Sequence, residues 1–224
     1  MIVEWGAVLE KTHFETVNHL KNLTEGHILY IFENIEKYIK NVAEFVMCGL
    51  EQNQYSLIIE NDRINLMLKK SFASLLSKDQ LNKVMIINNY DFYYVKGDFR
   101  CNSIFEYLPK LIEGYSEEGF SVRSWAHVEW GDEAEVHKKL SNSEKEAGII
   151  VNDKKLLSVC AYDSDRVSEE LKGSLISHHN FLLNDQDNTP ERSVSEANQK
   201  RIQQLLDRRA LREEYYKTLA KKWH

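Results

Sequence analysis

The sequence is poor in cysteine, proline and glycine, and each shortage excludes a class of protein. Among 224 residues there are three cysteines, two prolines and nine glycines. Cys48, Cys101 and Cys160 form no CxxC pair, which argues against zinc ribbons and thioredoxin-like redox motifs. So little proline and glycine excludes collagen-like and linker-rich architectures. An odd number of widely spaced cysteines fits a reducing compartment, and we therefore expect a cytoplasmic protein.

Long apolar runs and an excess of positive charge are also missing. No segment approaches the roughly 20 apolar residues that span a bilayer, and the first residues lack the cationic start and apolar centre of a signal peptide. The formal net charge is −6 and the isoelectric point is near 5.8. Because no apolar run is long enough, we expect no membrane partner. Because nucleic-acid-binding domains are usually basic, we expect no nucleic acid as a direct partner either.

The common phosphate-binding and catalytic motifs are absent as well. The turn after the first apolar run reads YIFENIEKY; it has no glycine and carries Glu33 and Glu36, which excludes a GxxxxGK[ST] phosphate loop there. The motifs GxGxxG, HExxH and GxSxG do not occur. We therefore predict no catalytic residue, the pattern identifies no cofactor, and a non-enzymatic role is favoured.

Eight histidines raise the question of a metal site. His178 and His179 are adjacent, so on a helix they point about 100° apart and do not easily share one metal. His127 and Glu129 share a strand face, and Cys160 could join them from a neighbouring strand, although no diagnostic spacing supports this set. Cys160 in an apolar run is more typical of a small core residue. The sequence thus favours no metal site.

Alternating apolar strands and amphipathic helices make up most of the chain. Compact apolar runs predict strands, and apolar residues at helical spacing predict helices. The expected strands are residues 26–32, 55–60, 83–88, 120–130 and 155–162, and the expected helices are residues 8–22, 33–52, 62–77, 103–118, 132–147 and 165–178. This alternation predicts a three-layer α/β fold with a mostly parallel central sheet of about five strands and extra helices at both termini.

Polar and aromatic side chains follow the predicted strands. Ligands of parallel sheets bind outside the carboxyl ends of the strands, and small-molecule pockets combine aromatic walls with a few polar groups. We expect Arg123 to hold an anionic or polar group of a small-molecule ligand, and Trp130 and Tyr162 to supply apolar walls. The candidates at this edge are Glu33, Tyr90, Arg123, Glu129, Trp130, Tyr162 and Asp163.

The sequence leaves other roles open for these residues. Asp163 could cap the next helix, and Arg123 could pair with Glu129 or Asp163 inside the fold. Glu129 and Glu33 could act as paired carboxylates, which would make the chain a carboxylate-assisted hydrolase. A degenerate RecA-like nucleotide-binding protein is the other alternative, held back by the missing phosphate loop.

The C-terminal segment differs in charge from the rest of the chain. Residues 184–190 are polar, end at Pro190 and are typical of a linker. Residues 191–224 carry nine Lys and Arg against five Asp and Glu, a net of +4, which leaves −10 on the remainder. An apolar stripe at helical spacing ends at Trp223. We expect a basic amphipathic helix that packs on the acidic body of this chain or of a sister subunit, in a homodimer or against a regulatory partner. A helix serving an external acidic partner is the alternative.

Several segments, taken in order, resemble one family, the MEDS domains, or methanogen/methylotroph dichloromethane-regulator sensory domains. The resemblance covers about residues 26–183 and includes the segments GHILYIFEN, FVMCGLEQNQYSLII, GDFR, GFSVRSWAHVEW and LLSVCAYD. The chain has His178–His179 where the family pattern often ends in His–Pro. The matching positions are Gly26, His27, Phe45, Gly49, Leu50, Gly97, Phe99, Arg123, Glu129, Trp130, Cys160, Tyr162, Asp163 and His178.

The resemblance implies a fold, a role and further site residues. It implies a RecA/KaiC-like α/β fold without a working phosphate loop, with strand order 5-1-4-3-2. It also implies a non-catalytic sensory role with small hydrocarbon-derived ligands, in a family found beside DNA-binding or kinase modules that this chain lacks. His27, Tyr30 and His178 complete the expected ligand-binding set. The expected domain plan is an N-terminal helical segment at 1–25, the sensory domain at 26–183, the linker at 184–190 and the C-terminal helix at 191–224.

Overall fold

An uninterrupted apolar run makes Gly26–Phe32 the interior strand β2, since strands buried on both faces show no polar alternation. The computed structural model describes residues 12–14, 17–94, 110, 121–131 and 136–183. Seven strands of this part form one sheet in the order β1-β7-β2-β6-β5-β3-β4, and all neighbouring strands pair in parallel. The other six are β1 (Thr12–Phe14), β3 (Tyr55–Glu60), β4 (Val84–Asn88), β5 (Val122–His127), β6 (Leu157–Asp163) and β7 (Phe181–Leu183).

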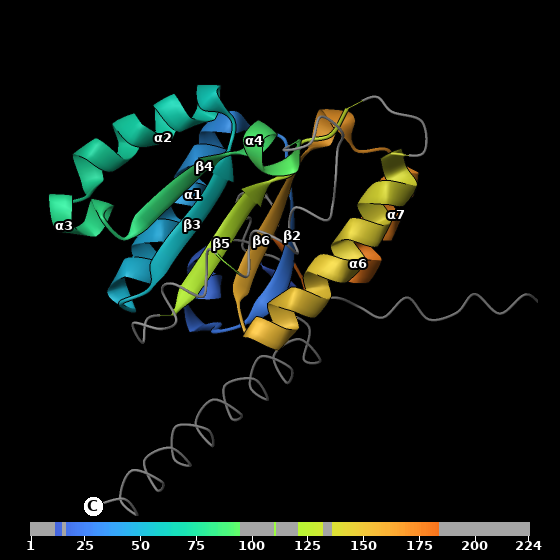
Figure 1. Ribbon diagram of the computed structural model, residues 1–224, viewed down its shortest axis with the longest axis horizontal. Helices are drawn as coiled ribbons and strands as arrows, with labels where there is room; N and C mark the ends of the chain where they lie inside the picture. The colour runs from blue at the N-terminus through green and yellow to red at the C-terminus, as the bar shows by residue number, and fades with distance from the viewer. Residues whose placement is uncertain (1–11, 15–16, 95–109, 111–120, 132–135, 184–224) are drawn as a thin grey trace, which may run out of the picture.

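Helices cover both faces of this sheet, as Figure 1 shows. Helices α1 (Ile35–Glu51) and α2 (Asp62–Leu75) pack on one face, and α6 (Val136–Lys154) and α7 (Glu169–His178) pack on the other. The remaining described helices are short: α3 (Lys78–Leu81), α4 (Asn89–Tyr93) and the 3-10 helices η1 (Val17–Asn22) and η2 (Ser164–Arg166). None of the described helices combines the length and the apolar character needed to span a bilayer.

Alternating strand residues divide the core into two layers. Tyr30 and Trp125 join the layer beneath α1 and α2, whereas Leu29 and Cys160 join the layer beneath α6 and α7. Successive side chains of a strand point to opposite faces, so a strand buried on both sides feeds both layers. Polar side chains in the middle of an interior strand, such as Ser124 and Ser158, are therefore buried as well.

The predicted three-layer α/β class with a parallel sheet is confirmed. The predicted strand order 5-1-4-3-2 is wrong for the five strands that we expected: in their own chain order they run 1-5-4-2-3 across the sheet. The error arises because the five expected strands include β4 and leave out β7. β4 lies at the sheet edge, and the short β7 was not predicted. The five adjacent strands β7-β2-β6-β5-β3, numbered along the chain, read 5-1-4-3-2.

Expectations for the termini have a mixed outcome. The helix predicted over residues 8–22 is wrong where the structure describes it, because Thr12–Phe14 is a strand paired with β7 and Val17–Asn22 is a 3-10 helix. The 103–118 helix, apart from Lys110, and the 184–190 and 191–224 segments lie outside the described residues.

The start of α1 occupies the place where a phosphate loop would sit in a nucleotide-binding sheet. Asn34 caps this helix, and its side-chain oxygen accepts hydrogen bonds from the main-chain N–H groups of Glu36 and Lys37. Helix N-termini bind phosphate through such N–H groups. Here two of them are already satisfied, and carboxylates flank the turn.

Gly49 allows α1 to approach β5 closely. A Cβ atom at this position would lie 2.9 Å from Cδ and 3.1 Å from Nε of the buried Arg123 side chain. In contrast, a Cβ atom at Gly173 in α7 would meet nothing within 4 Å. The same substitution should therefore have opposite effects at the two sites.

We expect Gly49→Ala to lower the free energy of unfolding by about 1–3 kcal/mol, because overpacking displaces a fully buried side chain. Gly173→Ala is the matched control, and should raise that free energy by up to about 1 kcal/mol through helix propensity alone. Urea unfolding of both variants measures the difference. Equal stabilisation by both substitutions would contradict the close approach at Gly49.

Candidate functional site

A buried carboxylate at the carboxyl end of β3 organises one polar centre. Glu60 is fully buried. Its Oε1 lies 2.6 Å from Nδ1 of His127 at the end of β5 and accepts from the main-chain N–H of Asn61 at 2.7 Å. The Tyr38 hydroxyl in α1 donates to Oε2 and accepts from Nε1 of Trp125 at 3.0 Å. We call Glu60, His127, Tyr38 and Trp125 the Glu60 centre.

Aromatic rings enclose this centre and leave one histidine nitrogen available. The Phe32 ring meets His127 edge-on with centroids 5.2 Å apart, and Tyr38 lies 5.7 Å from the same imidazole. Burial, followed by the Glu60 carboxylate, raises the pKa of Tyr38 well above its usual value, so this hydroxyl remains a donor. Within the described part of the chain, Nε2 of His127 has no hydrogen-bond partner.

The Glu60 centre lies where neighbouring strands send their connections to opposite faces. β3 leads into α2 on one face, and its neighbour β5 leads to α6 on the other. Such switch points, outside the carboxyl ends of the strands, are where open α/β sheets bind ligands. The side-chain amide of Asn89, in α4, donates to the main-chain oxygen of His127 at 3.4 Å and links α4 to this point.

A second buried carboxylate organises a centre on the other face of the sheet. Glu144 in α6, His27 in β2, Cys160 in β6 and His179, just after α7, are each at most 6% exposed. Among the described residues, these four bring potential metal-ligand atoms within 4.8 Å of one another. We call these four residues the Glu144 centre.

Directed hydrogen bonds orient the two imidazoles of the Glu144 centre. Nδ1 of His27 faces the His178 carbonyl oxygen at 3.3 Å, and Nδ1 of His179 faces the Leu175 carbonyl oxygen at 2.7 Å. Both Nε2 atoms lie 3.2 Å from Oε2 of Glu144, and the rings stack with centroids 3.9 Å apart. Nε2 of His27 is also 3.2 Å from Sγ of Cys160.

Burial and charge set the protonation of this centre. Burial would raise the pKa of the Glu144 carboxyl, but His179 and His27 hold it well below its usual value. Burial, followed by the neighbouring Glu144 carboxylate, raises the pKa of the Cys160 thiol well above its usual value. Burial lowers the pKa of His179. Glu144 is therefore charged and the thiol is neutral as long as no cation enters.

The predicted ligand-binding residues do not form one pocket. Of these residues, His27 belongs to the Glu144 centre, and Tyr162 adjoins it because its hydroxyl donates a hydrogen bond to Oε1 of Glu144. His178 contributes its carbonyl oxygen there, and its ring bonds the Ser141 hydroxyl at 3.0 Å. Tyr30 packs in the opposite layer, where its hydroxyl accepts from Asn41 at 2.9 Å.

Arg123 lies away from the carboxyl edge, at the beginning of β5. It is 1% exposed, donates to Oε1 of Gln54 at 2.7 Å and to the Phe45 carbonyl oxygen at 3.1 Å, and stacks on the Phe45 ring. No carboxylate among the described residues pairs with it, and burial lowers the pKa of its guanidinium to about 10. The alternative that Arg123 pairs with Glu129 or Asp163 inside the fold is therefore wrong.

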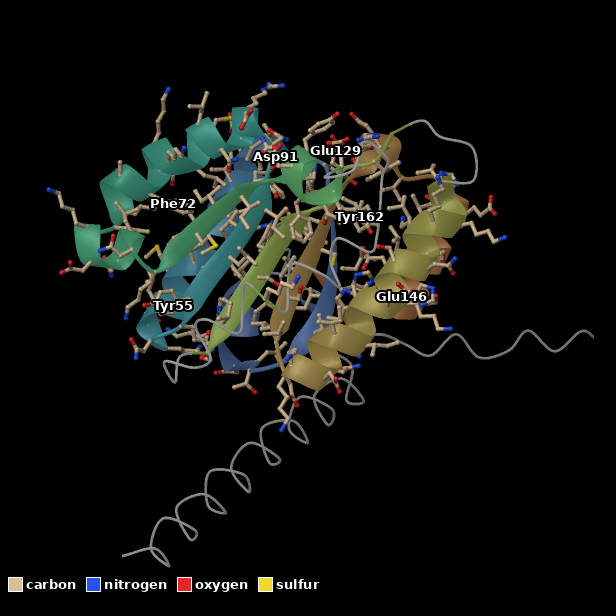
Figure 2. The ribbon with its side chains drawn as sticks, in the orientation of Figure 1. Tyr55, Phe72, Asp91, Glu129, Glu146 and Tyr162 are labelled. Atoms are coloured by element: carbon tan, nitrogen blue, oxygen red, sulfur yellow. The ribbon has the colours of Figure 1, made fainter. Side chains whose placement is uncertain are left out.

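Glu129 and Trp130 form a separate cluster with Arg166 at the carboxyl edge. Arg166 pairs with the Glu129 carboxylate, donates to the Trp130 carbonyl oxygen and stacks over the Trp130 ring at 4.2 Å. Asp163 caps η2, as the helix-cap alternative proposed. Figure 2 shows Asp91, Glu129 and Tyr162 toward the same end of the sheet, with Tyr55 at the other end.

The last two candidates lie near the molecular surface. Glu33 is exposed immediately after β2, and Tyr90 is 61% exposed in α4, where it stacks on Tyr94. The other member of the suggested carboxylate pair, Glu129, is already paired with Arg166.

Sequence reasoning missed two acidic residues of the centres, Glu60 and Glu144, and considered His179 only as a partner of His178. Glu60 is the final residue of an apolar strand, and a carboxylate in that place is a signal that could have identified it. Glu144 lies in a helix of mostly polar residues and carries no such signal. Cys160 was considered as a ligand beside His127 and Glu129, but the structure groups it with His27, Glu144 and His179 instead.

Comparison with known proteins supplies one match. The family model described as MEDS, the methanogen/methylotroph, DcmR sensory domain, matches residues 26–180. The matched stretch begins at the first residue of β2 and includes all the residues of both centres. A search of curated proteins gave no match.

The hydroxyl of Tyr38 should carry a measurable part of the stability. We expect Tyr38→Phe to lower the free energy of unfolding by about 1–3 kcal/mol, because Oε2 of Glu60 and Nε1 of Trp125 lose a buried partner. Tyr90→Phe removes the same atom from an exposed ring and should change it by at most about 0.5 kcal/mol. Urea unfolding monitors both. Equal losses would argue against the buried network.

Proposed function

Because the chain belongs to the family of MEDS sensory domains, we propose that it is a cytoplasmic, non-catalytic sensory module that binds a small molecule at the Glu60 centre. The observation that carries this proposal is the meeting of Glu60 and His127 at the switch point between β3 and β5. The small molecule is the signal, and the response passes to a protein contact.

The chemistry of the centre defines the class of ligand. Nε2 of His127 offers one hydrogen bond, as donor or acceptor according to the tautomer, while Glu60 fixes the ring from behind. Phe32, Tyr38 and Trp125 supply apolar surface around that polar point. A small, largely apolar molecule with a single hydrogen-bonding group fits this combination. The hydrocarbon-derived ligands suggested by the family resemblance belong to that class.

Thermal unfolding in the presence of a compound panel tests the proposal. The panel holds short-chain alcohols, aldehydes and halides, with carboxylates and nucleotides for comparison. A ligand at 100 times its Kd adds about 2.7 kcal/mol, which raises the Tm of a domain of this size by about 5–10 °C. We expect a member of the first group to do so in the wild type and not in His127→Gln.

His137→Gln is the matched control, because it makes the same change at an exposed histidine of α6. It should respond to the compound as the wild type does. A compound that stabilises His127→Gln as much as the wild type would place binding elsewhere. If no compound of the panel raises the Tm of the wild type, the proposed ligand class is wrong.

We infer that a second copy of this chain receives the signal through the basic segment 191–224. The support is the segregation of charge in the sequence, +4 on this segment against −10 on the remainder. Light scattering should give the mass of a dimer for the whole chain and of a monomer for a version ending at Asn188. Two monomers of equal Tm would contradict this inference and favour an external acidic partner for the segment.

A further inference from the structure

Four separate elements bring metal-ligand atoms to one buried point. His27 comes from β2, Cys160 from β6, Glu144 from α6 and His179 from the turn after α7. Two imidazole nitrogens, a thiol sulfur and a carboxylate oxygen are the donors that first-row divalent metals bind, with zinc the usual occupant of mixed N, S and O sets. The set shares no residue with the Glu60 centre.

The spacing of these atoms matches a tetrahedral site. Metal–ligand bonds of about 2.0–2.3 Å place tetrahedral donor atoms about 3.3–3.8 Å apart. The three pairs His27–Glu144, His179–Glu144 and His27–Cys160 each have a separation of 3.2 Å between their donor atoms. Since all the atoms lie within 4.8 Å, the widest pair needs to close by only about 1 Å around an ion.

Outer hydrogen bonds aim the donor atoms inward. Each imidazole directs Nδ1 at a main-chain carbonyl oxygen, an arrangement that leaves the Nε2 lone pair facing the centre. The Tyr162 hydroxyl occupies Oε1 of Glu144, which leaves Oε2 for the centre. That Oε2 is buried and accepts no directed hydrogen bond from the described residues. The donor atoms of the four side chains thus converge on one buried point that a metal ion could occupy.

Charge balance also favours a divalent ion. Glu144 is charged in this apolar layer, and burial of an uncompensated charge is costly. A divalent ion with the Glu144 carboxylate, the Cys160 thiolate and two neutral imidazoles gives a net charge of zero.

We propose that His27, Glu144, Cys160 and His179 bind one divalent transition-metal ion, with Zn²⁺ as the best match. All four positions are filled by protein and are buried, as in closed structural zinc sites. The ion fastens α6 and the end of α7 to β2 and β6. This site is independent of the proposed ligand site at the Glu60 centre.

Cobalt substitution of the full chain provides the test. The protein is treated with a chelator under reducing conditions and titrated with Co²⁺. We expect saturation at one equivalent, with the visible bands of tetrahedral Co²⁺ and a near-ultraviolet thiolate-to-metal band, both lost when Zn²⁺ is added. The spectrum of the wild type alone reports the geometry and the sulfur ligand, so the test does not depend on whether a variant folds.

Variants assign the ligands. Cys160→Ser should lose the thiolate band, and Cys48→Ser, at a buried cysteine of α1 on the other face, should keep it. His179→Asn should weaken binding, whereas His178→Asn should not. Tyr162→Phe should weaken it by about 10- to 100-fold, since it removes an outer hydrogen bond to a ligand.

Two results would overturn the metal site. One is a wild-type protein that takes up no stoichiometric Co²⁺, and the other is a thiolate band that survives Cys160→Ser. The centre would then be a proton-holding histidine–carboxylate network. Neither result bears on the sensory proposal, because the response of His127→Gln to ligands is measured separately and involves the opposite face of the sheet.

Discussion

The need to satisfy a charge inside a parallel sheet determines much of this structure. Glu60 and Glu144 are both fully buried, on opposite faces, and each gathers donors from elements far apart in the sequence. An isolated carboxylate in such surroundings would cost several kcal/mol. The aromatic hydroxyls of Tyr38 and Tyr162, which donate to the two carboxylates, are therefore as much a part of the fold as the apolar layers around them.

The pattern of the sequence was sufficient to predict the fold class, because short apolar runs such as residues 55–60 alternate with longer amphipathic segments. The pattern could not predict β7, because three residues are too few to show a period. Its pairing with β2 is a contact between segments that are far apart in the sequence. The polar centres were harder to predict for the same reason. Glu144 lies in a polar helix, and only the fold reveals that this position faces His27 and His179.

The chain belongs to the family of MEDS sensory domains, and its structure contains two buried polar centres. One lies at the carboxyl edge, where Asn89 ties α4 to His127. The other lies beneath α6 and α7, where the main chain of His27 exchanges two hydrogen bonds with Asn180. The two centres therefore lie on opposite faces of the sheet and contact different helices.

The position of β2 between β6 and β7 has a consequence for folding during synthesis on the ribosome. This apolar strand is among the first to be synthesised, yet both of its neighbours follow more than a hundred residues later. At about 5–20 residues per second, β2 waits roughly 6–25 s for β6 to be made. During that interval its two edges are open to any other extended chain. We therefore expect the nascent chain to need protection of β2 until β6 and β7 have been translated.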